Sequence, residues 1–306
     1  MPIQTSTTET NRNGRRANNE PESSGTDNRH GEPPTVSGRT AGDNGKMRSG
    51  HIPGRVAIVG AGPGDPELIT LKAVRLLRSA DVVLYDRLCN PDLLHFTRPG
   101  TRKICVGKQC GKPSISQADI NRLLISHARN GGMVVRLKGG DPFIFGRGGE
   151  ECMELAQHGI PFEVVPGISS ISAVPAYAGI PLTMRNQATG FTVISGHLHD
   201  GSDSYDWRAL AGISTLVILM GLKNLHRIIE ELIRNGKPAD TPIALIRWGT
   251  TVEQQVITGT LADIPAKTGG VTSPVTIVIG EVVQHTRELA WFQPERAHTR
   301  TVRQLS

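Results

Sequence analysis

Two Gly-Asp-Pro turns have the clearest potential for chemistry in this chain. Gly140-Asp141-Pro142 follows a Val- and Leu-rich run at residues 134–138, and Gly64-Asp65-Pro66 follows a similar run at residues 55–59. Such runs are typical of buried strands, and open α/β sheets bind ligands where their strands end. Each turn would place a carboxylate and several backbone N–H groups at such an end. We therefore predict one small-molecule site that is assembled from several loops.

The earlier turn partly resembles a dinucleotide-binding fingerprint. Gly60 and Gly62 have the G-x-G spacing, and Asp86 ends the second predicted strand, where an acid that binds ribose would stand. The third glycine of the fingerprint would fall at position 65, which is Asp, and prolines on both sides delay the helix. The spacing therefore disfavours a nicotinamide dinucleotide.

The elements that position these turns alternate between strand and helix patterns. Apolar runs predict strands at residues 56–59, 81–85, 103–106, 133–137 and 162–165, and segments with helical spacing lie between several of them. Ser116 and Asp119 have the spacing of a helix-capping pair. This βαβ alternation predicts a parallel sheet covered by helices on both faces.

A second series of strand patterns begins near Phe191, at residues 192–195, 215–220, 243–247, 255–258 and 275–279. The last two runs are too close for a long helix between them, so the second sheet should be mixed. We predict an α/β protein with two α/β domains, residues 51–168 and 169–285, and a hinge between Gly167 and Gly190. Residues 1–50 are predicted to be a disordered tail and residues 286–306 a polar one.

Composition narrows the class of protein. The 306 residues carry a net charge of +6, no dense basic block and only 4% aromatics, which disfavours a nucleic-acid-binding surface. The four cysteines lack a C-x-x-C pair, and His197 and His199 lack a third ligand, so we expect no metal site and no disulfide framework. The apolar runs are too short to span a bilayer. We expect a cytoplasmic protein without a membrane partner.

Six motifs occur in the order found in one family. They are GAGPGD at residues 60–65, YDRL at 85–88, VGK at 106–108, RLKGGDPFIFGRGGEE at 136–151, VPG at 165–167 and GIPLT at 179–183. Together they resemble the S-adenosylmethionine-dependent tetrapyrrole methylases, and most closely the branch that methylates uroporphyrinogen III. The resemblance runs from about residue 55 to residue 283. It implies a homodimer whose active site lies in the cleft between two α/β domains.

The resemblance also implies roles for individual residues. The methyl donor, S-adenosyl-L-methionine, would be surrounded by Pro63, Gly139, Gly140, Asp141, Ile144, Ser169, Ser170, Met220 and Gly249. Glycines would let the backbone approach the donor, and Asp141 could accept hydrogen bonds from its ribose or ammonium groups. For Met220, core packing is an equally good interpretation.

Asp86 and Lys108 match the family's proton acceptor and proton donor, and both follow predicted strands. Without the resemblance, Asp86 would be read as a turn or cap residue and Lys108 as a solvated charge. Four cations, Arg136, Lys138, Arg147 and Arg185, are candidates for binding the eight carboxylates of uroporphyrinogen III. Arg136 is the strongest of them and joins the predicted catalytic set, because a charge in an apolar strand needs a partner. Arg147 and Arg185 could equally be solvated surface charges.

Some positions depart from the family pattern. Ser169-Ser170 stands where Thr-Ala is common, and Met184 and Asn186 replace a His and an Asp. The dehydrogenase–chelatase module of some sirohaem enzymes is not in the chain. The expected reaction is methylation of uroporphyrinogen III at C2 and C7, which gives precorrin-2 for sirohaem, cobalamin or haem d1. The alternatives are methylation of a later precorrin, of RNA or of a modified protein histidine, and a non-catalytic sensor of the donor.

Overall fold

The computed structural model describes residues 54–107, 115–197 and 205–293. The predicted N-terminal tail, Lys108, Cys110 and His199 lie outside this part of the chain. Both sheets belong to one unit, Ser49–Ser306. Within the described ranges, no helix is both long enough and apolar enough to span a bilayer.

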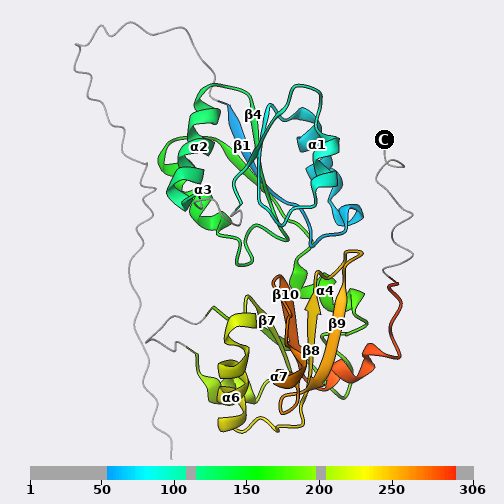
Figure 1. Ribbon diagram of the computed structural model, residues 1–306. Coiled ribbons are helices and arrows are strands. Elements are labelled where there is room, and N and C mark those ends of the chain that lie inside the picture. Colours follow the sequence, from blue (N-terminus) through cyan, green and yellow to red (C-terminus); the bar gives the residue numbers. More distant parts are fainter. Residues whose placement is uncertain (1–53, 108–114, 198–204, 294–306) are drawn as a thin grey trace, which may run out of the picture. The chain divides into compact units, whose positions relative to one another are not determined.

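The first half of the chain forms a five-stranded sheet with the order β3-β2-β4-β1-β5 (Figure 1). Its strands are β1 (Arg55–Gly60), β2 (Val82–Tyr85), β3 (Arg102–Cys105), β4 (Met133–Lys138) and β5 (Phe162–Val165). All four pairs of neighbours are parallel, which confirms the predicted parallel sheet. The loops that follow β1, β2, β4 and β5 therefore leave from the same edge.

Helices cover both faces of this sheet. α1 (Leu71–Ser79) packs on one face, and α2 (Gln117–Arg129) and α3 (Gly148–Gln157) pack on the other. The 3-10 helices η1 (Pro66–Leu68) and η2 (Pro91–Phe96) begin in the loops after β1 and β2. The predicted cap of α2 is confirmed, because the Ser116 hydroxyl accepts a hydrogen bond from the Asp119 N–H.

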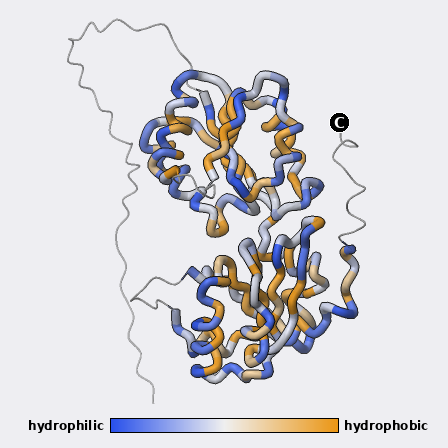
Figure 2. The backbone as a smooth tube through the Cα atoms, in the orientation of Figure 1, coloured by the Kyte–Doolittle hydropathy of each residue, from blue (hydrophilic) through white to orange (hydrophobic). Residues whose placement is uncertain are grey.

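The second sheet has the order β6-β7-β10-β8-β9. Its strands are β6 (Phe191–Ser195), β7 (Thr215–Leu219), β8 (Pro242–Arg247), β9 (Gln255–Thr260) and β10 (Val275–Ile279). β6 and β7 are parallel, whereas the other three pairs are antiparallel, so the prediction of a mixed sheet is confirmed. Figure 2 shows that apolar residues concentrate in the strands of both sheets.

The second sheet is also covered on both faces. α5 (Trp207–Ala211), α6 (Leu225–Arg234) and the short α7 (Ile264–Lys267) contribute to one core, and α4 (Ser170–Tyr177) and η4 (Glu281–Thr286) contribute to the other. η3 (Leu222–Asn224) leads into α6. α4 lies inside the segment predicted as a hinge, so this stretch is ordered structure that packs on the second sheet.

Candidate active site

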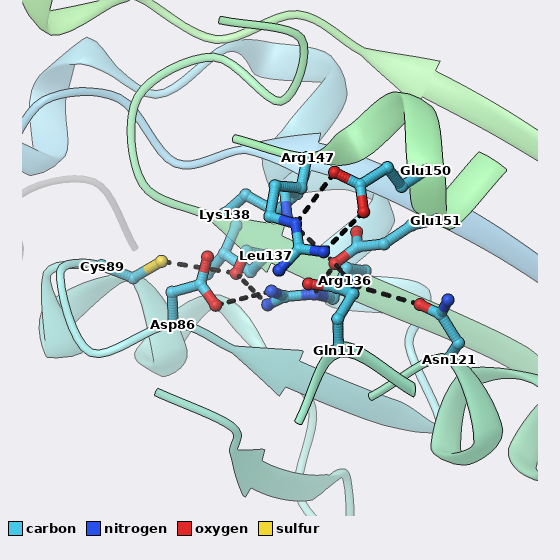
Figure 3. Close-up of polar contacts among 10 residues, drawn as sticks. All are labelled: Asp86, Cys89, Gln117, Asn121, Arg136, Leu137, Lys138, Arg147, Glu150 and Glu151. Atoms are coloured by element: carbon cyan, nitrogen blue, oxygen red, sulfur yellow. Dashed lines mark hydrogen bonds and ion pairs between the residues drawn. The ribbon is translucent and has the colours of Figure 1, made fainter. Parts of the chain in front are cut away.

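β4 carries two cations on a buried face. Side chains alternate along a strand, so Arg136 and Lys138 share the face on which Val134 packs toward α2 and α3. Both residues are 2% exposed. Their shared partner is Glu151 in the first turn of α3, whose Oε1 accepts a bond of 3.1 Å from Arg136 Nε and one of 2.9 Å from Lys138 Nζ (Figure 3). The sequence argument that Arg136 needs a partner is therefore confirmed, and the partner is a residue of the protein.

The Arg136 guanidinium also holds Asp86. Its Nη2 donates to Asp86 Oδ1 over 2.6 Å, while Nη1 donates to the Leu137 carbonyl over 3.2 Å. Asp86 follows β2, the neighbour of β4, and its own N–H donates to the same Leu137 carbonyl. With 30% of its side chain exposed, Asp86 is the solvent-facing member of this charged cluster of Asp86, Arg136, Lys138 and Glu151.

The electrostatics of the charged cluster follow from burial and charge. Burial alone would lower the pKa of Arg136, but the carboxylates of Glu151 and Asp86 outweigh it and raise the pKa above its usual value. Burial, and then the charge of Arg136, lowers the pKa of Lys138. Burial, followed by the charge of Asp86, raises the pKa of Cys89 to about 12. Cys89 is therefore a neutral thiol beside the charged cluster.

Glycines join the loops after β1, β4 and β5. The N–H and carbonyl groups of Gly62 and Gly140 bond to each other in both directions, over 3.2 and 2.7 Å. A Cβ on Gly60 would lie 2.5 Å from the backbone of Gly167, which only a glycine avoids. Their first function is thus to let three loops pack against each other.

Asp141 ties two of these loops together. Its Oδ1 accepts a hydrogen bond of 2.8 Å from the Phe143 N–H, and its Oδ2 accepts one of 3.1 Å from the Gly167 N–H. We call Gly60, Gly62, Gly140, Asp141 and Gly167 the glycine junction. Asp141 was predicted to bind the ribose or ammonium group of the donor. In the structure its carboxylate already organises the backbone around it.

The turn after β2 contacts the two glycine-rich loops, which follow β1 and β4. Asn90 Nδ2 donates to the Gly64 carbonyl over 2.8 Å. A Cβ on Gly139 would lie 3.4 Å from Leu88 Cβ, so this turn also lies against the loop after β4. The turn that begins at Asp86 therefore lies against the loops after β1 and β4.

The other residues predicted to bind the donor divide into two groups. Ser169 caps α4, and a Cβ on Gly140 would lie 3.8 Å from the Ser170 nitrogen, so this pair adjoins the glycine junction. Gly249 packs closely against Val174 of α4. Pro63 lies within the first glycine-rich loop, and the Ile144 N–H donates to the Asp141 carbonyl of the junction over 3.4 Å. Met220, directly after β7, is 51% exposed, so it is not a core residue. Their roles stay predictions.

A hydrogen-bonded network links the first loop to the segment after β8. Thr250 Oγ1 accepts a bond of 3.0 Å from the Asp65 N–H, and the Tyr177 hydroxyl donates to Asp65 Oδ2 over 2.8 Å. Gln254 Nε2 donates to the Tyr177 carbonyl over 3.1 Å. The Tyr177 ring lies 4.8 Å from that of Trp291. Thus Asp65, of the other Gly-Asp-Pro turn, is also held by partners within the protein.

The predicted substrate cations have different environments. Arg136 and Lys138 bind Glu151, and the exposed Arg147 forms two bonds with Glu150. Arg185 is exposed and, among the described residues, makes no ion pair. Lys108 cannot be placed, because it lies outside the described residues.

Sequence reasoning missed Glu151, Tyr177 and Thr250. Glu151 had a usable signal, because two cations two positions apart in a buried strand require a nearby anion. Thr250 adopts a left-handed conformation with φ of 70°, and the neighbouring Trp248 has φ of 48°. Such φ values are uncommon outside glycine, and no residue pattern around Thr250 indicates them. Among the described residues, no group of three or more His, Cys, Asp or Glu could hold a metal ion.

Comparisons with known proteins bear on the family of this chain. A family model described as tetrapyrrole (corrin/porphyrin) methylases matches residues 55–265. A siroheme synthase from Pseudomonas putida is 53% identical over 243 residues, which cover 78% of this chain and 52% of that protein. The chain thus spans about half the length of such relatives.

Solved structures give matches over nearly their whole length. A uroporphyrin-III C-methyl transferase from Thermus thermophilus, complexed with S-adenyl homocysteine, is 45% identical with a TM-score of 0.66. The match covers 76% of this chain and 99% of that one. A cobalt precorrin-4 methyltransferase is 28% identical with a TM-score of 0.67, over 75% and 95% of the two chains.

Proposed function

Because this chain belongs to the tetrapyrrole (corrin/porphyrin) methylases, we propose that it is an S-adenosylmethionine-dependent C-methyltransferase that converts uroporphyrinogen III to precorrin-2. The methyl groups would be added at C2 and C7. One observation carries the proposal: Asp86, a partly exposed carboxylate held by a buried arginine, lies in a turn that contacts both glycine-rich loops. A candidate base is thus adjacent to the candidate donor site.

The chain's residues suit the methyl donor. Gly139 and Gly140 expose backbone at the carboxyl end of β4, and Gly140 has φ of 65° beside the Ser170 nitrogen. Such backbone can approach a ligand closely, because it carries no Cβ. The donor, when bound, supplies an electrophilic methyl group. We assign Pro63, Ile144, Ser169, Met220 and Gly249 to the same site on the family resemblance.

Asp86 has the chemistry of the proton acceptor. Each transfer forms a carbon–carbon bond to the pyrrole ring, breaks the carbon–sulfur bond of the donor and releases one proton. A carboxylate held in place for that proton contributes about 10²–10⁴-fold to the rate. Alignment of the reacting atoms contributes more, since effective molarities reach about 10⁵–10⁸ M. Lys108 remains our candidate for the proton donor.

We propose that the exposed cations bind the carboxylates of the substrate. Arg185 is the first candidate, and Arg147 could exchange Glu150 for a substrate carboxylate. Arg136 and Lys138 are already engaged with Glu151, so we assign them to the support of Asp86. We extend the proposal to a homodimer, as the family resemblance implies, and to a cytoplasmic location, as the scattered cysteines suggest.

The test is an anaerobic incubation of the purified chain with uroporphyrinogen III and methyl-labelled S-adenosylmethionine, followed by mass analysis of the tetrapyrrole. We expect two labelled methyl groups per molecule. Labelling of a later precorrin or of RNA in place of uroporphyrinogen III would assign a different substrate. Tight donor binding without transfer to any of these substrates would favour a donor-sensing protein.

A further inference from the structure

Glu151 is a buried acid that forms ion pairs with two cations of the protein. Its side chain is fully buried, and its Oε1 accepts from Arg136, Lys138 and Gln117 Nε2, the last over 3.1 Å. Its Oε2 is buried and has no hydrogen-bond partner among the described residues. An acid in this position is costly to bury, so the two cations it binds are the evident reason for its presence.

The guanidinium of Arg136 transmits the position of Glu151 to Asp86. A guanidinium is planar and rigid, so two fixed N–H directions determine the third. Nε is fixed by Glu151 and Nη1 by the Leu137 carbonyl, and these two bonds aim Nη2 at Asp86 Oδ1. Without Glu151, Arg136 would keep the carbonyl and Asp86 as its partners and could pivot between them.

We propose that Glu151 is a positioning residue for the methyl transfer, which orients the Asp86 carboxylate through Arg136. This inference rests on the proposed function, since it requires Asp86 to act on the substrate. Glu151 makes no contact with Asp86 itself, so its effect on turnover passes through the guanidinium. In this arrangement Arg136 orients Asp86, and Glu151 fixes Arg136, as in other sites where a third group orients the partner of a catalytic residue.

Glu151→Gln tests this arrangement with little change in shape. The amide oxygen can still accept hydrogen bonds, but the compensating charge is gone. The charged cluster would then hold two cations and one carboxylate, and Lys138 is the cation that loses its proton more readily, because burial lowers its pKa. Glu151→Asp keeps the charge but withdraws the carboxylate by one methylene, and it serves if Glu151→Gln does not fold.

We expect Glu151→Gln to lower kcat by about 10- to 100-fold, since a displacement of about 1 Å in a catalytic group has effects of this size. The dissociation constant for S-adenosylhomocysteine should stay within about threefold, because the glycine junction is untouched. The matched control is Glu154→Gln on the same helix, whose side chain is 38% exposed and pairs with His158. It should leave kcat unchanged within about twofold.

A double-mutant cycle with Asp86→Asn separates positioning from general support of the fold. If Glu151 acts through Asp86, then Glu151→Gln should have almost no further effect on kcat in the Asp86→Asn background. Equal effects in both backgrounds, or a Glu151→Gln enzyme as active as the Glu154→Gln control, would overturn the inference. An inactive wild-type chain would instead contradict the proposed function, so the two failures are distinguishable.

Discussion

Asp86 and Asp141 follow adjacent strands of the same sheet, yet the protein holds them in different ways. Asp86 accepts one bond from a buried arginine, and its carboxylate is 30% exposed. Asp141 uses both oxygens to accept backbone N–H groups, one from its own loop and one from the loop after β5. A carboxylate that binds backbone on both sides is suited to fixing a loop. A carboxylate held at one oxygen by a rigid cation can be oriented while it remains accessible.

At this edge of the sheet, one group of residues is therefore suited to the chemical step and another to holding the loops in place. In the charged cluster, the buried Arg136 binds Asp86, and the fully buried Glu151 binds Arg136. The glycine junction joins three loops by short backbone contacts and needs no cation. We expect changes in the charged cluster to alter kcat more than donor affinity, and changes in the glycine junction to alter stability and donor affinity more than the chemical step.

The strongest test of this separation is Asp86→Asn. The amide cannot accept the proton released by the substrate, so kcat should fall by about 10²–10⁴-fold. The affinity for S-adenosylhomocysteine, measured by calorimetry, should change by less than about threefold. The control is Asp92→Asn, six positions along the chain, whose side chain is 42% exposed and which should retain turnover. A loss of donor affinity as large as the loss of kcat would show that Asp86 acts in donor binding as well as in the chemical step.

The sequence was sufficient to predict the strands of both sheets. β5 (Phe162–Val165) and β10 (Val275–Ile279) begin and end at the predicted residues, because short apolar runs with clear flanks define them. α4 was not predicted, since it contains Pro175 and lacks a clear polar face. A helix without amphipathic spacing gives no periodic signal.

The partners of the site residues could not be predicted from the sequence. The argument that Arg136 needs an anion was sound, but the anion comes from α3, 15 positions later. Glu151 stands in the first turn of a helix, where acids are common for reasons of capping and helix dipole. Only the packing of α3 on the sheet distinguishes it from the exposed Glu150 beside it. Asp141 was predicted to contact the donor, and the sequence could not show that its carboxylate accepts from the Phe143 N–H of its own loop and from the Gly167 N–H of the loop after β5.

The next largest effect is expected from Gly167→Ala in the glycine junction. A Cβ at this position would overlap the Gly140 carbonyl oxygen and lie 2.7 Å from Gly60 Cα, so the backbone itself would have to move. Forced overpacking costs about 1–3 kcal/mol or more, and we expect the upper end in the free energy of unfolding by denaturant titration. Donor affinity should fall with it.

Gly149→Ala is the matched control for that substitution. A Cβ there meets nothing within 4 Å, and Gly149 lies within α3. Alanine favours a helix over glycine by about 0.5–1 kcal/mol, so this variant should be as stable as the wild type or more so. Equal stability of the Gly167→Ala and Gly149→Ala proteins would contradict the close packing of the three loops.

A smaller effect is expected from Asp141→Asn. The side-chain amide can accept one of the two backbone N–H groups, but its NH₂ group would face the other donor. Loss of one such bond should lower the free energy of unfolding by about 1–3 kcal/mol. The kcat at saturating donor should change far less than in Asp86→Asn. A kcat as low as that of Asp86→Asn would show that both carboxylates take part in the chemical step.

The smallest effect concerns Asp65, the third aspartate at this edge, through its partner Tyr177. Tyr177→Phe removes the hydrogen bond to Asp65 but keeps the ring that packs on Trp291, so we expect a loss of about 1 kcal/mol near pH 8. Burial, and then the bond to Asp65, raises the pKa of Tyr177 in the folded state. A group with a raised folded pKa contributes its full stabilisation below its unfolded pKa of about 10 and loses it as the pH rises further.

The stability difference between wild type and Tyr177→Phe should therefore narrow above about pH 10, because the unfolded wild-type chain ionises first. Denaturant titrations of both proteins at about pH 8 and pH 10.5 measure this directly, and subtraction removes the groups that titrate in both. A difference that stays constant or widens would mean that the Tyr177 hydroxyl is solvated and does not hold the loop. Asp65 would then be held by Thr250 and by the Glu67 N–H, and the first glycine-rich loop would depend less on the segment around Trp291 than the structure indicates.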